Sequence, residues 1–157
     1  MAQTSSSHPA DLRPVHILVG GLIAGLCVNL VDVPNSALLV SPEWMRILAG
    51  QGITPSVPLI GCFFTVLHFV YGVPLVLVYA WGLPRFGTGV QAALFSALPL
   101  LVTNRLFGLG AVVMGQMPLG IYARFSWSLV LGTLLGAIAG ARVHDLLGRR
   151  ASTATAA

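Results

Sequence analysis

The sequence predicts an all-α integral membrane protein, a bundle of four transmembrane helices with a short interfacial helix between the first and second spans. Three observations predict this class. The mean hydropathy is +0.89. Hydrophobic residues make up 56% of the 157 residues and charged residues only 8%, against roughly 25% charge in soluble globular proteins. Four apolar stretches also reach the roughly 20 helical residues that cross about 30 Å of hydrocarbon.

The chain is expected to hold one domain flanked by two tails. Residues 1–12 are polar and Ser-rich, and we expect them to be disordered. No cleaved signal peptide is expected, because the first apolar run begins only at Pro14 and extends too far. The membrane domain is expected over residues 13–147, and a second disordered tail over residues 148–157.

The first predicted span covers residues 14–33. Pro14 sits in its first turn, where a missing N–H costs little. Pro34 begins a stretch, reaching to Pro58, whose prolines, glycines and polar residues break the apolar pattern. We therefore expect the first span to end before Pro34.

A short helix is expected inside that stretch, over residues 42–50. Ser41 is a suitable N-cap, and Pro42 suits the first helical position. Apolar residues fall on one side of this helix, so we expect it to rest on the membrane surface with Trp44 at the level of the headgroups.

The other three spans are expected over residues 57–81, 88–112 and 123–143. A glycine-containing turn separates the second from the third, and Pro99 predicts a kink in the third. The uncharged stretch 106–123 leaves two alternatives open. It is either the end of the third helix followed by a loop, or a re-entrant segment.

Arginine supplies all the positive side-chain charge outside histidine and predicts the orientation. With four spans, one side of the membrane holds Arg13, Arg85, Arg142, Arg149 and Arg150. The other side holds Arg46 and Arg124, and Arg105 is unassigned. Arginine-rich ends face the cytoplasm, so both termini are expected there. The arginines do not gather on one soluble face, and no nucleic-acid binding is expected.

Each predicted span carries one stripe of small and polar residues, because positions three or four apart share a helix face. The first stripe includes Gly21 and Gly25, and the fourth is a double GxxxG of Gly132, Gly136 and Gly140. Small residues let helices approach closely in lipid. We expect the stripes to face each other inside the bundle. The alternative is that the fourth stripe faces a partner subunit.

A polar cluster is expected within the outer part of the membrane. Placing an ionisable group in the hydrocarbon is unfavourable, by about 2.5–3.5 kcal/mol at the bilayer centre on insertion scales. Because Asp32 and Arg105 lie at similar depth, we expect them to pair, with Asn29 and Asn104 hydrogen-bonding nearby. Arg124 is the rival partner for Asp32. Such a cluster is either a structural clasp or a site, open to the outer face, for an anion, a headgroup or a substrate.

His68 is central in the second span and is expected to make one interhelical hydrogen bond. Haem ligation by two histidines would need a second histidine at similar depth, whereas His16 and His144 fall near the cytoplasmic edge. Cys27 and Cys62 lie apart in apolar runs, so neither a disulfide nor a zinc site is expected. We therefore predict no cofactor and no metal.

No enzyme motif is recognisable. The sequence contains no GxSxG, HExxH or P-loop pattern, and no GxGxxG opening a βαβ unit. The four acidic residues are scattered, so no pair of carboxylates is available for acid–base catalysis. We predict that the protein is not an enzyme.

The first half resembles an uncharacterised family of small bacterial four-helix membrane proteins. The matching residues are the run Gly20–Gly25, then Asn29, Asp32, Asn35 and Trp44, and the stretches Tyr79–Ala80 and Pro84–Gly87. The resemblance covers roughly residues 17–95, and the second half departs from it at Asn104 and Arg105. It implies a four-helix topology in the bacterial inner membrane, and it carries no activity.

Two functions are compatible with this sequence. The first is an accessory or structural subunit of a larger membrane assembly, supported by the small size and by the GxxxG stripe. The second is a small transporter or channel that uses the polar residues, as an oligomer because four helices rarely enclose a pathway. The partners expected are the lipid bilayer, together with other membrane subunits or further copies of the chain.

Overall fold

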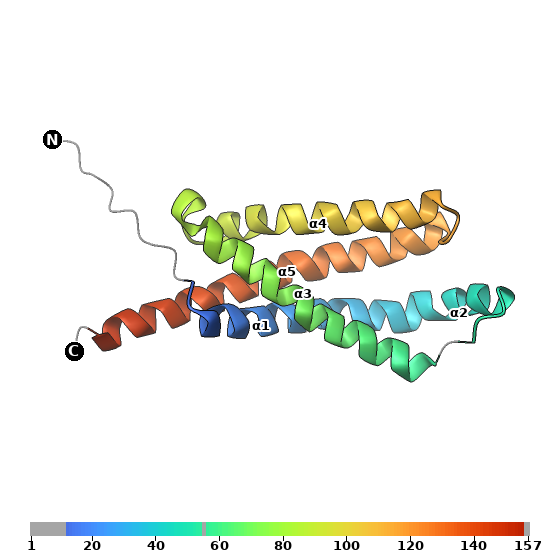
Figure 1. Cartoon of the computed structure of the whole chain (residues 1–157), viewed down its shortest axis with the longest axis horizontal. Helices are drawn as coiled ribbons and strands as arrows, with labels where there is room; N and C mark the ends of the chain where they lie inside the picture. The colour runs from blue at the N-terminus through green and yellow to red at the C-terminus, as the bar shows by residue number, and fades with distance from the viewer. Residues whose placement is uncertain (1–11, 55, 156–157) are drawn as a thin grey trace.

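The computed structural model describes residues 12–54 and 56–155, and the predicted N-terminal tail falls almost entirely outside them. Within the described residues the fold is all-helical, which confirms the predicted class (Figure 1). The elements are α1 (Pro14–Asn35), a π-helical turn η1 (Ser36–Val40), α2 (Ser41–Gly50), α3 (Val57–Phe86), α4 (Val90–Val113) and α5 (Leu119–Thr155). Four of these helices are long enough and apolar enough to cross a membrane.

The first helix does not end before Pro34, and this part of the prediction is wrong. Pro34 lies inside α1, and the helical path continues through η1 directly into α2. The N–H of Ser36 bonds to the carbonyls of both Asp32 and Val33, so backbone groups near the proline keep partners. A π-type turn accommodates such a local change in hydrogen bonding. The expected helix near 42–50 therefore exists as an extension of α1, and its position at a membrane surface stays a prediction.

The second and fourth of the long helices are longer than expected. α3 continues past residue 81 to Phe86, with Pro84 in its last turn, and it ends at Gly87, whose φ of 70° suits glycine. α5 begins at Leu119 and continues to Thr155. The predicted disordered tail from residue 148 is therefore wrong as far as Thr155, because helix-forming residues follow Gly148 with no proline to stop them.

The stretch 106–123 is the end of α4, a tight turn and the start of α5. Gly115 adopts a φ of 71° in this turn, and Pro118 directly precedes α5. Of the two alternatives, the structure favours a helix followed by a loop over a re-entrant segment.

α1 is the centre of the bundle, and its glycines bring it against α3 and α5. A Cβ at Gly21 would lie 2.7 Å from the Cα of Val73, and a Cβ at Gly25 would lie 2.6 Å from the Cα of Phe69. Gly72 on α3 faces the backbone of Gly21 and Gly25 in return. α1 and α3 therefore cross almost backbone to backbone.

The double GxxxG of α5 packs against the other side of α1. A Cβ at Gly136 would lie 2.7 Å from the carbonyl oxygen of Ala24, and a Cβ at Gly140 would lie 2.8 Å from that of Gly20. Gly132 faces the backbone of Val28 in the same way. The stripe is thus used inside the chain, so it is not a surface left over for a partner subunit.

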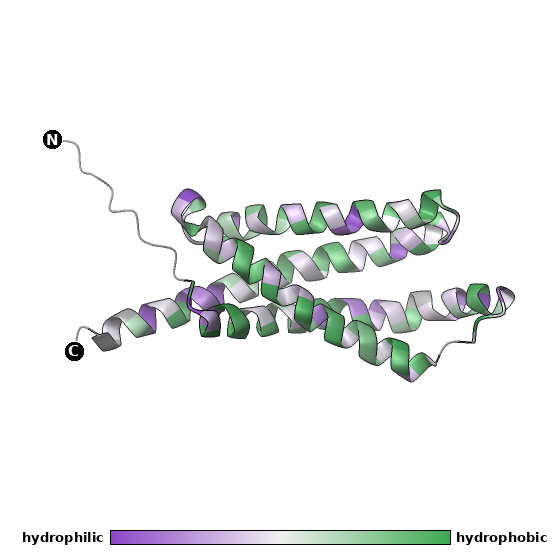
Figure 2. Cartoon of the chain, viewed as in Figure 1, coloured by the Kyte–Doolittle hydropathy of each residue, from purple (hydrophilic) through white to green (hydrophobic). Residues whose placement is uncertain are grey.

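α4 packs on α5 and α3, on the far side of the bundle from α1 (Figure 1). Its contact with its neighbours is built from small residues, since Ala93 clusters with Ala141, and Ala97 clusters with Ala137. Large apolar side chains are exposed along the four long helices, with Phe107 86% exposed. Figure 2 shows hydrophobic residues distributed along all four of these ribbons. The surface around the middle of the bundle is therefore apolar, and the polar contacts are inside.

Candidate functional site

A buried polar cluster lies where α1, α3 and α5 meet. We call it the Asp32 cluster, and its members are Asn29, Asp32, Asn35, His68 and Ser128. All five residues are buried, with Asp32 and His68 each only 6% exposed. On α1 the polar positions recur at intervals of three, which places Asn29, Asp32 and Asn35 on one face. That face is directed between the two helices that the glycines hold close.

The Asp32 carboxylate is held from two helices. The hydroxyl of Ser128 on α5 donates to its Oδ1 at 2.6 Å, and the hydroxyl of Ser36 on η1 donates to its Oδ2 at 3.2 Å. Asn35 completes this side, because its Nδ2 donates to Ser128 Oγ at 2.9 Å and to the carbonyl of Arg124 at 3.1 Å. Buried polar groups need such partners to offset their lost hydration.

His68 approaches the same carboxylate from α3. Its Nε2 lies 3.5 Å from Asp32 Oδ2, and its Nδ1 lies 2.9 Å from Asn29 Oδ1. The amide of Asn29 is oriented by its Nδ2, which donates to the carbonyl of Thr65 at 3.2 Å. Asn29 Oδ1 can only accept, so Nδ1 of His68 carries a hydrogen. In a neutral ring, Nε2 then presents a lone pair toward a carboxylate.

This geometry defines a place for one proton. Two acceptors facing each other across 3.5 Å repel unless a proton lies on one of them, either on the imidazole or on the carboxyl group. The arrangement does not match a nucleophilic triad, because the Ser128 hydroxyl donates to Asp32 and not to His68. Among the described residues, no group of three or more His, Cys, Asp or Glu could hold a metal ion.

The predicted ion pair between Asp32 and Arg105 is wrong. Within the described part of the chain, Arg105 instead donates to Ser126 Oγ at 2.9 Å and to Asn104 Oδ1 at 2.8 Å, and its guanidinium lies 5.9 Å from the centre of the Tyr122 ring. The rival partner, Arg124, pairs with Glu43 at 2.7 Å near the surface. The pairing was expected only because Asp32 and Arg105 have similar predicted depths in the membrane. In the structure, α4 holds Arg105 on the side of α5 that faces away from Asp32.

A second polar group, which the sequence reasoning missed, lies at the opposite end of the bundle. The Tyr79 hydroxyl donates to Asp145 Oδ2 at 2.8 Å, and Asp145 Oδ1 lies 3.6 Å from His144 Nδ1. The rings of Tyr79 and His16 each meet the His144 ring edge-on with centroids 6.0 Å apart. His16 and His144 were assigned to the cytoplasmic edge without being brought together. A paired tyrosine and aspartate near two helix ends would have been the available signal.

Tight helix contacts separate these two polar groups. His68 and Tyr79 are 11 residues apart on α3, which is roughly 16 Å along a helix. Between them, Gly72 of α3 contacts Gly21 and Gly25 of α1, and Val76 contacts Gly140 of α5. The backbones leave no room for side chains at these glycine contacts, but the same stretch also holds two buried hydroxyl groups, those of Tyr71 on α3 and Thr133 on α5.

Comparison with known proteins finds no matching family model, no similar curated protein and no similar solved structure. The family resemblance of the first half therefore stays a prediction. Its residues nevertheless occupy defined places, because Asn29, Asp32 and Asn35 belong to the Asp32 cluster and Gly20, Gly21 and Gly25 line the contacts of α1.

Proposed function

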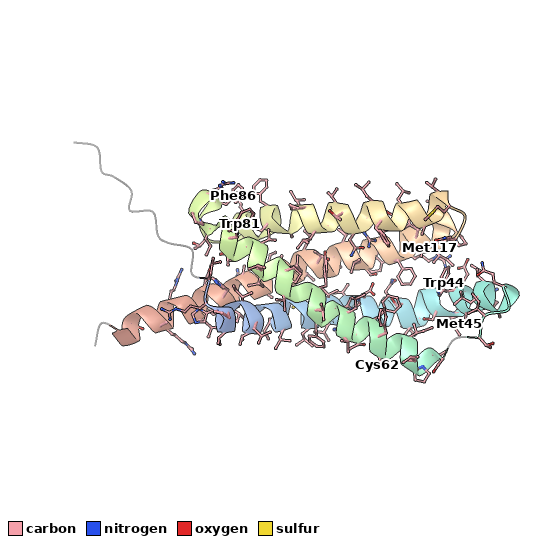
Figure 3. The ribbon with its side chains drawn as sticks, viewed as in Figure 1. Trp44, Met45, Cys62, Trp81, Phe86 and Met117 are labelled. Carbon is pink, nitrogen blue, oxygen red and sulfur yellow. The ribbon has the colours of Figure 1, made fainter. Side chains whose placement is uncertain are left out.

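We propose that this chain is a multi-pass protein of the bacterial inner membrane, with four spans and both termini in the cytoplasm. Four long apolar helices and an apolar outer surface support membrane residence. Tryptophan supports it too, since Trp81 lies near one end of the bundle and Trp44 near the other (Figure 3), and tryptophan is enriched at both membrane interfaces.

Arginine supports the orientation. The end at which α1 begins and α5 ends carries Arg13, Arg85, Arg142, Arg149 and Arg150, and the remaining three arginines belong to α2, to α4 and to the start of α5. Lys and Arg accumulate on the cytoplasmic side of membrane proteins. We therefore propose that the arginine-rich end faces the cytoplasm.

We further propose that the Asp32 cluster binds and exchanges a proton, and that the protein is a small transporter or channel acting as an oligomer. The observation that carries this proposal is the 3.5 Å approach of His68 Nε2 to Asp32 Oδ2 in a buried site. Aspartate and histidine inside a membrane mark proton relays, and histidine changes charge near physiological pH. The close glycine contacts between α1 and α3 would limit passage from this site toward the other end of the bundle.

The spatial order of the polar groups suggests that protons reach the Asp32 cluster from the outer end of the bundle. The Arg124–Glu43 ion pair is surface-exposed, and the carbonyl of Arg124 accepts from Asn35. Asn35 donates to Ser128, which donates to Asp32. These contacts form a hydrogen-bonded series from the backbone carbonyl of Arg124, whose own side chain is exposed, to the buried carboxylate.

Proton flux into liposomes tests the proposal. The purified protein is reconstituted with a pH-sensitive dye inside, and a potassium gradient with valinomycin drives protons inward. We expect Asp32→Asn to reduce the flux by at least about tenfold, a conservative figure beside the roughly 10²–10⁴-fold contributed by positioned acid–base groups. The matched control is Glu43→Gln, which makes the same chemical change at an exposed carboxylate. Equal flux in wild type and Asp32→Asn would eliminate the transport proposal.

The second candidate is a non-catalytic accessory or structural subunit of a larger membrane assembly. Its former support from the GxxxG stripe is lost, because that stripe packs on α1. The outer face of α4 is what favours it, since Phe107 and Val113 are more than 80% exposed there. A stoichiometric partner retained after solubilisation in mild detergent would support this candidate, and a clean monomer would count against it. Neither candidate involves an enzyme reaction or a cofactor.

A further inference from the structure

Two hollows lie along the pair formed by α4 and α5, and they differ in chemistry. The first, of about 260 Å³, is at the arginine-rich end and is lined by Thr88, Gly89, Arg142, Asp145, Leu146 and Arg149. It lies where α4 begins, and Gly89, the residue before that helix, provides no side-chain cap for its first N–H groups. Uncapped amides at a helix start and guanidinium groups both favour an anion.

The second hollow, of about 470 Å³, is apolar. It is lined by Leu94, Phe95 and Leu98 of α4 and by Leu134 of α5, with Gln91 at one end. Phe95 is 59% exposed although it is a large aromatic residue. A hollow of this composition fits a hydrocarbon chain.

The two hollows are consecutive along one side of the helix pair. Ala93 clusters with Ala141, and Ala97 clusters with Ala137, so the two helices run antiparallel in this register. Leu134 and Arg142 are eight residues apart on α5, which places them on the same side and roughly 12 Å apart. Gln91, in the first turn of α4, lines the apolar hollow and is only three residues from Thr88, which lines the polar one.

We propose that this side of α4 and α5 binds one anionic phospholipid, with its phosphate in the polar hollow and an acyl chain in the apolar one. The inference rests on the proposed membrane residence and is independent of proton transport. The polar end lies at the end of the spans, where headgroups are found, and the apolar end lies deeper. An arginine pair at that level attracts anionic lipid.

Asp145 reduces the positive charge of the polar hollow. Its contacts with Tyr79 and His144 also help to hold the lining of the hollow in place. Its two oxygens are engaged on the inner side, with the Tyr79 hydroxyl at 2.8 Å and His144 at 3.6 Å. The lining residues together still carry a net positive charge, since Arg142 and Arg149 outnumber this one carboxylate. The Tyr79 hydroxyl also accepts from the N–H of Gly89 at 3.4 Å, which links the hollow to the buried polar group.

Binding of defined probes to the full chain in dodecyl maltoside tests the proposal. The probes are dioctanoyl phosphatidylglycerol, dioctanoyl phosphatidylcholine and inorganic phosphate, and the readouts are native mass spectrometry and the thermal midpoint. We expect one phosphatidylglycerol to bind and to raise the midpoint. Phosphatidylcholine tests the chains without net negative charge, and phosphate tests the anion without chains.

Adjacent arginines provide a matched pair of variants. Arg149→Gln removes a lining charge, whereas Arg150→Gln makes the same change at a residue outside the hollow. We expect Arg149→Gln to weaken phosphatidylglycerol binding about fivefold and Arg150→Gln to change it less than twofold. If Arg149→Gln lowers the midpoint without lipid, Arg142→Gln makes the same test. Leu98→Trp should fill the apolar hollow and weaken binding of both lipids.

Three results would overturn the proposal. Equal weakening by Arg149→Gln and Arg150→Gln would indicate diffuse surface attraction. Equal binding of the two lipids would remove the role of the phosphate charge. Phosphate binding as tight as phosphatidylglycerol, unchanged in Leu98→Trp, would assign the polar hollow to a free anion. Loss of transport in Asp32→Asn is measured separately, so either proposal can fail alone. Extraction of the protein from membranes by alkaline carbonate would refute both proposals, because both require an integral membrane protein.

Discussion

Gly72 lies where α1 and α3 come closest, and its replacement by alanine tests how the bundle is held together. A Cβ at residue 72 would overlap the carbonyl oxygen of Gly21 and lie 2.5 Å from the backbone nitrogen of Gly25. Both obstacles are backbone atoms, so no side-chain rotation can relieve them. The helices would have to separate by roughly 1 Å to restore an ordinary contact at that point.

The expected cost follows from that separation. A gap of about 0.5–1 Å forfeits roughly a quarter to a half of the dispersion energy of each contact, and overpacking costs about 1–3 kcal/mol. The higher helix propensity of alanine offsets this loss of stability by roughly 0.5–1 kcal/mol. Because Gly72 is opposed by backbone atoms of two residues of α1, we expect Gly72→Ala to lower the free energy of unfolding by about 2 kcal/mol.

Reversible unfolding in mixed dodecyl maltoside and dodecyl sulfate micelles measures this change, with circular dichroism as the signal. Gly61→Ala is the matched control, because it is the same substitution in the same helix and a Cβ there would meet nothing within 4 Å. We expect this control to be neutral or slightly stabilising. Equal stability of the two variants would refute the view that close contact at Gly72 holds α1 and α3 together.

Two further substitutions probe the polar groups by the same unfolding measurement. Ser128→Ala should cost about 1–3 kcal/mol, because it leaves a buried oxygen of Asp32 without its donor. In double-mutant cycles with Asp32→Asn, Ser128→Ala should couple by at least about 0.5 kcal/mol and Arg105→Gln by less, and the reverse order would restore the rejected ion pair. Tyr79→Phe should cost about 1–2 kcal/mol, because it removes a 2.8 Å hydrogen bond to Asp145. An unchanged free energy would show that this bond contributes nothing.

Hydropathy and small-residue spacing predicted the class of fold and the positions of the spans, because both are properties of single helices. Gly21 and Gly25 could be assigned to a contact face from sequence, since i and i+4 residues share a side of any helix. The residue at which α1 ends could not be predicted from the sequence. Pro34 is a local helix breaker, and the helix that continues past it is held by the π-type turn and by tertiary contacts of Asp32 and Asn35 with α5, which the local sequence does not reveal.

The partner of Asp32 could not be predicted because it depends on which helices are neighbours. Similar depth made Arg105 the natural candidate, yet α4 packs on the far side of α5. Ser128 was recognised only as part of a small-residue stripe. Its hydroxyl reaches the carboxylate because Gly132, one turn further along α5, brings that helix against Val28 of α1.

The contact between the first and the last helix also bears on how the protein is made. Asp32 emerges from the ribosome 96 residues before Ser128. At elongation rates of roughly 5–20 residues per second, the carboxylate waits on the order of 5–20 s for that partner. During this interval α1 has a polar stripe and no α5 to cover it. In the proposed membrane location, stable insertion of α1 would depend on α3, on a chaperone or on the insertion machinery until synthesis of α5 is complete.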